Sequence, residues 1–336
     1  MLVSVVLPAY NAELYIKESI DSILTQTFTN FELIVLNDGS TDKTEDIILS
    51  YQDNRIVYVK NEQNLGLIRT LNKGIALAKG KYIARMDADD ISFPNRFAKQ
   101  VGFLEAHPDY VICGTSAYRF NEDFSHKKVF NVPIDDENIR VRLFFNNAFI
   151  HPSVMFRTET IRTHNLSFNE NYKYAEDYYF WMDLLQHGKG FNLKEKLLYY
   201  RVVETSQTAI GNSNIDKRKE ILCNIHRRYF DDYKITVDDL EVNVNFYLSN
   251  IERMKLLNLR ENDIFLINTL LYKIISVLKV SDLNYNVILK EIGRVYFSLL
   301  YVKGYQVIKC KGFLNSFNVK LILAGGWSFV RERIVK

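Results

Sequence analysis

Cysteine is scarce in this chain, and the few that occur lie far apart. The 336 residues contain three cysteines, Cys113, Cys223 and Cys310. None belongs to a CxxC pair or stands at a spacing typical of zinc ligands, so the sequence argues against a disulfide framework and a zinc site. Because this composition suits a reducing compartment, we expect a cytoplasmic protein.

Long apolar runs are also missing. No stretch of about 18 apolar residues occurs, and the N-terminus runs directly into "LVSVVLPAY" without a basic leader. We therefore expect neither a transmembrane helix nor a secretion signal. The sequence also lacks GxGxxG after its first strand-like run and lacks GxxxxGK[ST] altogether, which removes the main support for dinucleotide oxidoreduction and P-loop chemistry.

Proline disappears halfway along the chain. All five prolines precede residue 153, and residues 1–209 carry a net charge of −4 whereas residues 210–336 carry +7. Leu, Ile and Tyr recur at helical spacing through the basic second part. These shifts predict two domains, an α/β domain over residues 1–209 and a mainly helical domain over residues 210–336.

The first part alternates short β-branched apolar runs with amphipathic segments. This alternation predicts a mostly parallel sheet with helices on both faces. A helix over 172–187 and a strand over 194–203 complete the expected domain, and Ser40 or Thr41 is the expected N-cap of the second helix. We expect strands at 2–10, 31–39, 55–61 and 81–87, and helices at 12–27, 41–52 and 66–79.

Polar residues follow three of these strands. Pro8 to Asn11, Asn37 to Ser40 and Asp87 to Asp90 stand at carboxyl ends, where ligands bind in parallel α/β sheets. We therefore expect these three segments to converge on one site.

The run "MDADD" ends a strand that reads as buried. Asp87 and Asp89 stand two positions apart, so their side chains point to the same side. One carboxylate can then ligate a divalent cation while the other meets the cation's ligand, and Mg²⁺ or Mn²⁺ would keep positions open for phosphate oxygens. A solvated loop, with Asp90 as a helix cap near Pro94, is the competing interpretation.

The run "NDGS" also allows two interpretations. Asp38 could accept hydrogen bonds from a nucleobase or ribose, and Gly39 permits close backbone approach. The same residues are typical of a plain strand-to-helix turn.

Five segments, taken together, resemble the inverting family 2 glycosyltransferases of the GT-A fold. The resemblance covers roughly residues 3–208 and implies transfer of a sugar from a nucleotide-sugar donor, in the simplest case a UDP-hexose, in bacterial glycan biosynthesis. The segments are "SVVLPAYN", "LNDGSTD", "NLGLIRTLNKGIALAKGKYIARMDADDI", "HPSVMFR" and "AEDYYFWMDLLQHG".

The resemblance implies a role for each matching position. On the donor side, Asp38 would contact the base, Asp87 the ribose and metal, and Asp89 the metal that bridges to the diphosphate. On the acceptor side, Asp177 would be the catalytic base and Glu176 its neighbour. The remaining donor contacts implied are Pro8, Ala9, Tyr10 and Arg69.

Some family positions differ or allow a structural role. Val203 stands where members often carry a His that supports the metal or diphosphate, with Thr205, Ser206 or Gln207 as polar substitutes. Leu71, rather than Arg, precedes Asn72. Trp181 belongs to an apolar helical stripe that favours the core. His151 is either a cleft residue or a satisfied structural histidine.

The basic second part carries no recognised catalytic pattern. A basic run contains Lys217, Lys219 and Arg227. It suits an acceptor-binding module that contacts the anionic inner face of the membrane. It equally suits an oligomer interface, a lid over the acceptor cleft or a solvated helix face. We expect no nucleic-acid partner.

The acceptor is expected to be a hydroxyl of a protein-linked, lipid-linked or capsule-precursor glycan. The main alternative is a non-catalytic nucleotide-sugar-binding or scaffold subunit of a glycan assembly complex. A nucleotidyltransferase is disfavoured, because "LPAYNAELYIKESI" offers no glycine-rich phosphate loop.

Overall fold

The chain folds into two compact units. One, here called the sheet unit, comprises Met1–Ile134 and Phe149–Ser213; the other, the helical unit, comprises Asp135–Ala148 and Asn214–Lys336. The computed structural model describes residues 1–121, 127–203, 211, 214–259, 263–280, 283–304, 307 and 318–326. The predicted boundary at 209/210 falls outside the described residues and stays a prediction.

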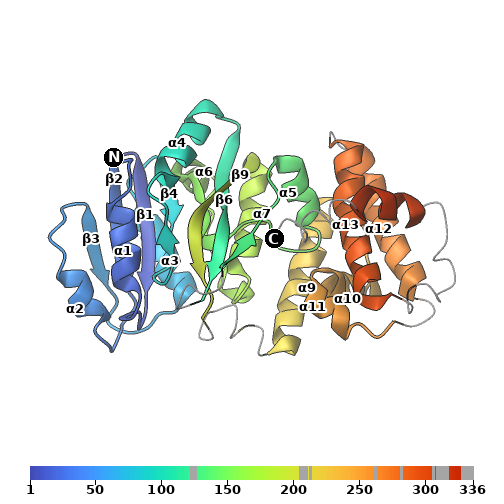
Figure 1. The fold of residues 1–336 in the computed structure, drawn as a ribbon, viewed down its shortest axis with the longest axis horizontal. Coiled ribbons are helices and arrows are strands. Elements are labelled where there is room, and N and C mark those ends of the chain that lie inside the picture. Colours follow the sequence, from blue (N-terminus) through green and yellow to red (C-terminus); the bar gives the residue numbers. More distant parts are fainter. Residues whose placement is uncertain are drawn as a thin grey trace. The chain divides into compact units, whose positions relative to one another are not determined.

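Within its described residues, the sheet unit contains one mixed sheet of nine strands (Figure 1). The strand order is β3-β2-β1-β4-β8-β6-β9-β5, and β7 pairs with β6. The strands are β1 (Val3–Ala9), β2 (Phe31–Asn37), β3 (Ile56–Lys60), β4 (Tyr82–Arg85), β5 (Ile91–Ser92), β6 (Tyr110–Phe120), β7 (Lys127–Phe130), β8 (Met155–Arg157) and β9 (Lys189–Arg201).

The predicted α/β sheet is confirmed, and its parallel part lies where the sequence alternates most regularly. Strands β3, β2, β1 and β4 are parallel, as are β6 and β9, whereas β8, β7 and β5 pair antiparallel with their neighbours. The carboxyl ends of β1, β2 and β4 therefore point the same way, which places the polar residues that follow them at one edge.

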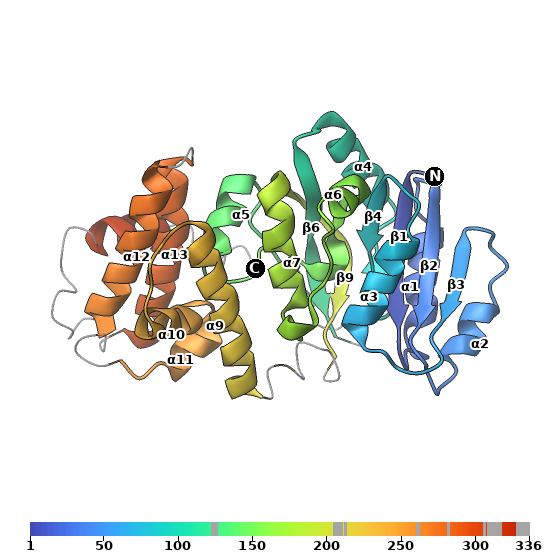
Figure 2. The same cartoon turned by 180° about the vertical axis from the view of Figure 1, so that it is seen from behind.

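Helices cover both faces of this sheet (Figures 1 and 2). Helix α3 packs closely against the sheet at Gly74. A Cβ at this position would lie 2.4 Å from Val6 Cγ1, which leaves no room for a side chain. The α-helices of the sheet unit are α1 (Ile16–Leu24), α2 (Thr44–Leu49), α3 (Leu67–Leu77), α4 (Arg96–Ala106), α6 (Thr158–Thr163) and α7 (Glu176–Leu184), and its short 3₁₀ turns are η1 (His151–Ser153), η2 (Glu170–Tyr172) and η3 (Leu185–His187).

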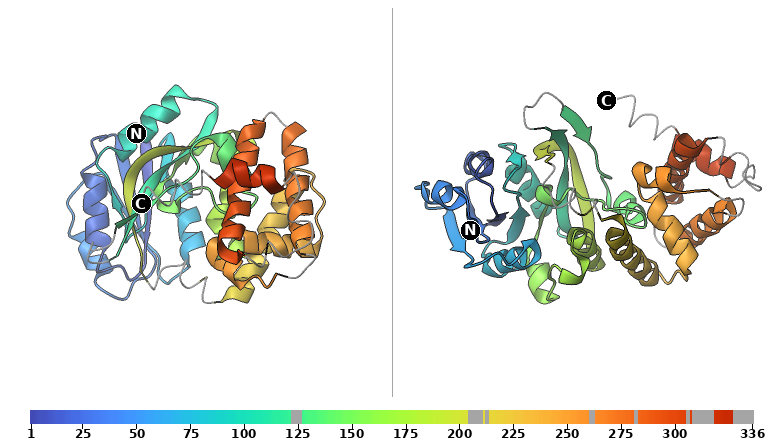
Figure 3. Two further views of the ribbon diagram at one scale, coloured as in Figure 1. Left: turned by 45° about the vertical axis from the view of Figure 1, so that its right-hand side comes forward. Right: turned by 90° about the horizontal axis from the view of Figure 1, so that it is seen from below.

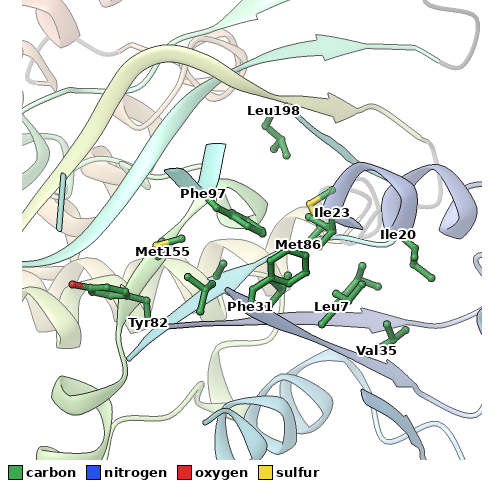
Figure 4. Packing of buried hydrophobic residues seen from close by; sticks show 14 of the residues in the cluster. Leu7, Ile20, Ile23, Phe31, Val35, Tyr82, Met86, Phe97, Met155 and Leu198 are labelled. Carbon is green, nitrogen blue, oxygen red and sulfur yellow. The ribbon is translucent and has the colours of Figure 1, made fainter. Parts of the chain in front are cut away.

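The core of the sheet unit follows from the alternation of side chains along the strands. Leu7 and Val35 point to the face that packs against Ile20 and Ile23 of α1, as Figure 4 shows. Burying one such side chain contributes about 1.5–3 kcal/mol. Tyr82 belongs to the same cluster. Because side chains alternate along a strand, those of Ile83 and Arg85 in β4 face away from this cluster.

The helical unit contains the helices predicted for the second part, together with one segment from the first. In Figures 1 and 3, α12 and α13 run side by side, and α5 packs against α13. Its helices are α5 (Asp136–Arg142), α9 (Ile215–Asp232), α10 (Asp239–Leu248), α11 (Ile251–Leu256), α12 (Asp263–Val280) and α13 (Tyr285–Lys303), and residues 318–326 are also helical. Across the described ranges, no helix combines the length and apolar character that crossing a membrane requires.

The predicted cap of the second helix is wrong. Helix α2 begins at Thr44, and its N-cap is Lys43 rather than Ser40 or Thr41. The hydroxyl of Ser40 accepts a hydrogen bond from the Asn11 backbone instead, because the chain continues as a turn after β2. Asp42 Oδ1 accepts from the Thr44 backbone at 3.0 Å and so satisfies part of the helix start.

Candidate functional site

The loops after β1 and β2 are fastened to each other by hydrogen bonds. Asn11 adopts a left-handed conformation (φ 46°), which its side chain tolerates, and its Oδ1 accepts from the Thr41 backbone at 2.9 Å. The Glu13 backbone donates to Asp42 at 3.1 Å. Pro8 and Ala9 are buried in β1, whereas Tyr10 is 49% exposed and available to a ligand.

Asp38 is buried where β2 ends, and its carboxylate is already used within the protein. Oδ1 accepts from Asn61 Nδ2 at 2.8 Å and from the Leu65 backbone at 2.9 Å, and Oδ2 accepts from the Gly66 backbone at 3.0 Å. These bonds fix the loop that leads into α3. Asp38 thus fixes the turn, as one of the two interpretations of "NDGS" predicts. A nucleobase would bind the carboxylate lone pairs that these hydrogen bonds leave free.

Gly39 is required by this turn. Its φ is +71°, and a Cβ would lie 2.7 Å from the Gln63 carbonyl carbon. A side chain at this position would displace the loop that Asp38 holds.

Asp87, Asp89 and Asp90 form a carboxylate cluster directly after β4. One oxygen of each lies within 4.8 Å of the others. Burial, followed by the charge of Asp87, raises the pKa of Asp89 to about 7. Grouped carboxylates suit a hard divalent cation such as Mn²⁺ or Mg²⁺, which prefers oxygen ligands. The donor set therefore fits the predicted metal, with Asp87 and Asp89 as its candidate ligands.

The loop that carries the cluster is held from α1 and β9. Ser19 Oγ donates to the Asp87 carbonyl at 2.7 Å. Arg201 Nε donates to the Asp89 carbonyl at 2.7 Å, and the Arg201 backbone donates to Asp90 Oδ1 at 2.8 Å. The interpretation of Asp90 as a helix cap in a solvated loop is wrong: α4 begins at Arg96 with Asn95 as its N-cap, and Asp90 is buried and joined to β9 instead.

Arg201 is a supporting residue that the sequence analysis missed. Its side chain is 3% exposed, and Nη2 pairs with Glu18 at 2.6 Å. Arg201 stands two positions before Val203, where family members often carry a His, so the signal for it lay in the sequence beside that position. Val203 is half-buried, and Thr205, Ser206 and Gln207 lie outside the described residues.

Arg85 is the second residue that was missed. It is the last residue of β4, its side chain is 2% exposed, and its Nη1 forms an ion pair with Asp87 Oδ1. Nothing in the periodicity of the strand distinguishes a buried arginine from an exposed one, so no local pattern could have identified it.

Glu176 and Asp177 begin α7 as a carboxylate pair. Glu176 is buried, and burial together with the charge of Asp177 raises its pKa to about 7, while Arg85 opposes the rise. Tyr174, two residues before Glu176, has a φ of 73°, a strained conformation of the kind found at functional sites. A buried carboxylate with a pKa near neutrality is typical of proton-transfer sites.

Arg69 lies on the exposed side of α3 and is not aimed at the carboxylate cluster. Its Nε pairs with Glu170 Oε2 at 2.9 Å, which connects α3 to η2. Asn72 joins the same region, because its side chain both donates to the Phe168 carbonyl and accepts from the Phe168 backbone. Contact of Arg69 with a donor base therefore requires the ion pair to open.

Trp181 and His151 are buried side by side. The core position of Trp181 is confirmed: the residue is fully buried, and its ring contacts Phe149, Phe168 and Phe180. His151 packs against Phe168 and Trp181, and its Nε2 has no hydrogen-bond partner among the residues that the structure describes. Burial, reinforced by the charge of Arg85, lowers the pKa of His151 well below its ordinary value, so the ring is neutral.

The sequence that supplies the carboxylate cluster matches a known family. The sequence profile of "Glycosyl transferase family 2" matches residues 4–171, half of the chain. The chain belongs to this family. Membership supports transferase activity over the non-catalytic alternative.

A curated relative and two solved structures agree with the assignment. The UDP-Glc:alpha-D-GlcNAc-diphosphoundecaprenol beta-1,3-glucosyltransferase WfaP of Escherichia coli is 33% identical over 225 residues, which are 67% of this chain and 86% of WfaP. S. aureus TarS 1-349 with UDP-GlcNAc superposes with a TM-score of 0.61 at 18% identity, over 92% of this chain and 90% of TarS 1-349.

The second solved structure comes from an archaeal enzyme. The mannosyltransferase PcManGT of Pyrobaculum calidifontis, with GDP-Man and Mn2+, superposes with a TM-score of 0.54 at 16% identity, over 98% of this chain and 87% of that one. At these identities both structures establish the fold of the glycosyltransferase rather than its substrates.

Proposed function

We propose that this glycosyltransferase transfers a hexose from a UDP-hexose to a hydroxyl of a glycan acceptor by metal-dependent inverting displacement. The observation that carries the proposal is the carboxylate cluster of Asp87, Asp89 and Asp90 after β4. Asp87 and Asp89 would hold Mn²⁺ or Mg²⁺. The bound metal would neutralise charge that develops on the departing diphosphate.

The protein's own residues would divide the remaining work. Pro8, Ala9, Tyr10 and Asp38, at the ends of β1 and β2, would hold the nucleoside. Asp177 would accept the proton of the acceptor hydroxyl as it attacks the sugar, with Glu176 as its neighbour in the acceptor site. A positioned base of this kind contributes about 10²–10⁴ in rate. Attack from the face opposite the leaving group inverts the anomeric carbon.

UDP-hexose is proposed as the donor because WfaP is named for UDP-Glc. The WfaP name also includes a diphosphoundecaprenol-linked acceptor and a β-1,3 linkage. An inverting displacement on an α-linked donor would yield a β linkage. We therefore favour a lipid-linked saccharide over protein-linked and capsule-precursor acceptors.

A lipid-linked acceptor suits contact with an anionic membrane surface through α9. Lys217 is exposed and available for this contact, whereas Arg227 pairs with Asp239 at 2.6 Å and Lys219 lies over the Tyr247 ring. The electrostatic contribution would thus come from few residues. A homo-oligomer through the C-terminal region is a separate proposal, which sedimentation of the full chain tests.

The role of Asp177 can be tested by Asp177→Asn. The substitution removes the base and keeps the shape, so transfer should fall by about 10²–10⁴ while calorimetric binding of UDP with Mn²⁺ is retained. Asp183→Asn makes the same change later in α7 and should leave transfer unaltered. Undiminished turnover in Asp177→Asn would remove this residue as the base.

The donor is best identified with a panel of nucleotide sugars. Each is assayed with Mn²⁺ for hydrolysis and for transfer to a diphosphate-linked lipid saccharide. We expect UDP-hexoses to be the best donors. Preference for a GDP-sugar would contradict the UDP assignment and leave the reaction class intact.

A further inference from the structure

Arg85 has a charge that the proposed reaction does not use. Its side chain extends from the last position of β4, is 2% exposed and forms an ion pair with Asp87. A guanidinium stays protonated in proteins, so this charge is permanently buried. A buried charge is strongly destabilising unless an opposite charge balances it.

Arg85 lies among carboxylates and beside one other buried arginine, Arg96, whose Nη2 donates to the Arg85 carbonyl at 2.6 Å. Asp87 is in direct contact with the guanidinium, Asp89 and Asp90 belong to the same carboxylate cluster, and the charge of the guanidinium also acts on Glu176. The neutral ring of His151 adds no competing positive charge. Arg85 is therefore placed to balance the acidic groups of both the donor side and the acceptor side.

A divalent cation at Asp87 and Asp89 would repel Arg85. The guanidinium is in ion-pair contact with Asp87, one of the two candidate ligands, so the two positive charges would share a carboxylate. Like charges that share a partly buried carboxylate repel each other more strongly than they would in water. The metal and Arg85 would thus compete for the same negative charge.

We propose that Arg85 is a positioning residue that acts as the internal counter-ion of the carboxylate cluster. It holds Asp87 in place when no metal is bound, and it weakens metal binding. This inference rests on the proposed metal-dependent function. Moderate metal affinity would serve turnover, because the metal and the diphosphate product must be released together or in sequence.

The test compares Mn²⁺ binding in the wild type, Arg85→Met and Arg85→Lys, measured by calorimetry and by the Mn²⁺-induced rise in Tm of the full chain. Arg85→Met should lower the Tm of the metal-free protein and bind Mn²⁺ on the order of tenfold more tightly, because a repelling charge is gone. Arg85→Lys keeps the charge, so its Mn²⁺ affinity should stay within about threefold of wild type.

Arg157→Met is the matched control. Arg157 is half-buried and donates to the carbonyls of Leu104 and Tyr110, so its loss should lower Tm without changing Mn²⁺ affinity. If Arg85 acted in folding alone, Arg85→Met would likewise lower Tm without changing Mn²⁺ affinity. Unchanged or weaker Mn²⁺ binding in Arg85→Met therefore overturns the proposal.

Two further outcomes are decisive. If Arg85→Met is unfolded without metal, Mn²⁺ should restore its folding, and failure to do so at saturating Mn²⁺ contradicts the counter-ion role. Absence of Mn²⁺ binding in the wild type would overturn both this inference and the metal-dependent function. Wild-type binding with unaltered affinity in Arg85→Met would overturn the counter-ion role alone.

Discussion

The carboxylate cluster of the sheet unit and the buried carboxylates of the helical unit differ in the charge of their neighbours. In the sheet unit, burial and the charge of Asp87 raise the pKa of Asp89 to about 7. In the helical unit, burial would raise the pKa of Glu291, but Arg142 and Arg294 lower it overall. Their nitrogens lie 3.1 and 3.6 Å from Glu291 Oε2. The charges around each carboxylate thus decide the direction of its pKa shift in the two units.

Glu241 extends the comparison within the helical unit. It is 3% exposed at its side chain, pairs with Lys273 at 2.6 Å and completes a capping box with Asp238 at the start of α10. Charges arranged in this way stabilise a helix bundle. Carboxylates grouped together repel one another unless a cation or another partner balances them, and such groups are typical of functional sites.

The largest expected effect is that of Asp89→Asn. Losing a metal ligand should reduce transfer on the order of 10³-fold, because the departing diphosphate loses its counter-charge. Stability near neutral pH should be maintained, since a repelling carboxylate is removed. Steady-state kinetics and urea unfolding of the same preparation check both results. If Asp89→Asn is stable and transfers sugar at the wild-type rate, the carboxylate cluster has no role in transfer and the contrast between the two units fails.

Glu291→Gln should show the reverse pattern. Removing the acid leaves the side chains of Arg142 and Arg294 without its charge, and breaking a buried pair typically costs about 3–5 kcal/mol. Urea unfolding should report a loss of about 3 kcal/mol, and binding of UDP with Mn²⁺ should persist at temperatures where the variant is folded. A loss below about 1 kcal/mol would show that this pair does not stabilise the unit.

Glu176→Gln sharpens the comparison through pH. The pKa of Glu176 is 4.5 in the reference state and about 7 when folded, so between these values the folded protein binds the extra proton. Its contribution to stability is therefore present at low pH and is lost as pH rises toward 7. Relative to wild type, the variant should gain on the order of 2 kcal/mol between pH 4.5 and pH 8. If the free energies of unfolding of wild type and Glu176→Gln, measured in urea, changed equally with pH, the prediction would be contradicted.

The smallest expected effect concerns the surface of the helical unit. Lys217→Glu exchanges an exposed positive charge for a negative one and should weaken binding to vesicles that contain anionic lipids by about 1–2 kcal/mol. Transfer to a short water-soluble acceptor analogue should not change. Vesicle sedimentation at low and moderate salt measures the effect, and no difference at low salt would remove the proposed membrane contact of α9.

Residues whose roles follow from local pattern could be predicted from the sequence. The parallel strands β1, β2 and β4 follow from their apolar runs, and the core position of Trp181 follows from its helical stripe. Asp87 and Asp89 were found because their spacing carries a chemical meaning. Each of these signals lies within about ten consecutive residues.

Features that depend on distant contacts could not be predicted. Arg201 reaches Asp89 and Asp90 across more than one hundred positions, and Arg85 is distinguished only by its burial beside Asp87. The assignment of Asp135–Ala148 to the helical unit was also missed, because α5 packs on α13, about 150 positions later in the chain.

The central claim is that the carboxylates of the sheet unit form a cation site and those of the helical unit do not. Calorimetric titration of Mn²⁺ into the wild type, Asp89→Asn and Glu291→Gln tests it most directly. The account predicts binding in the wild type, its loss in Asp89→Asn and its retention in Glu291→Gln. Mn²⁺ binding that survives Asp89→Asn, or that disappears in a folded Glu291→Gln, would contradict it.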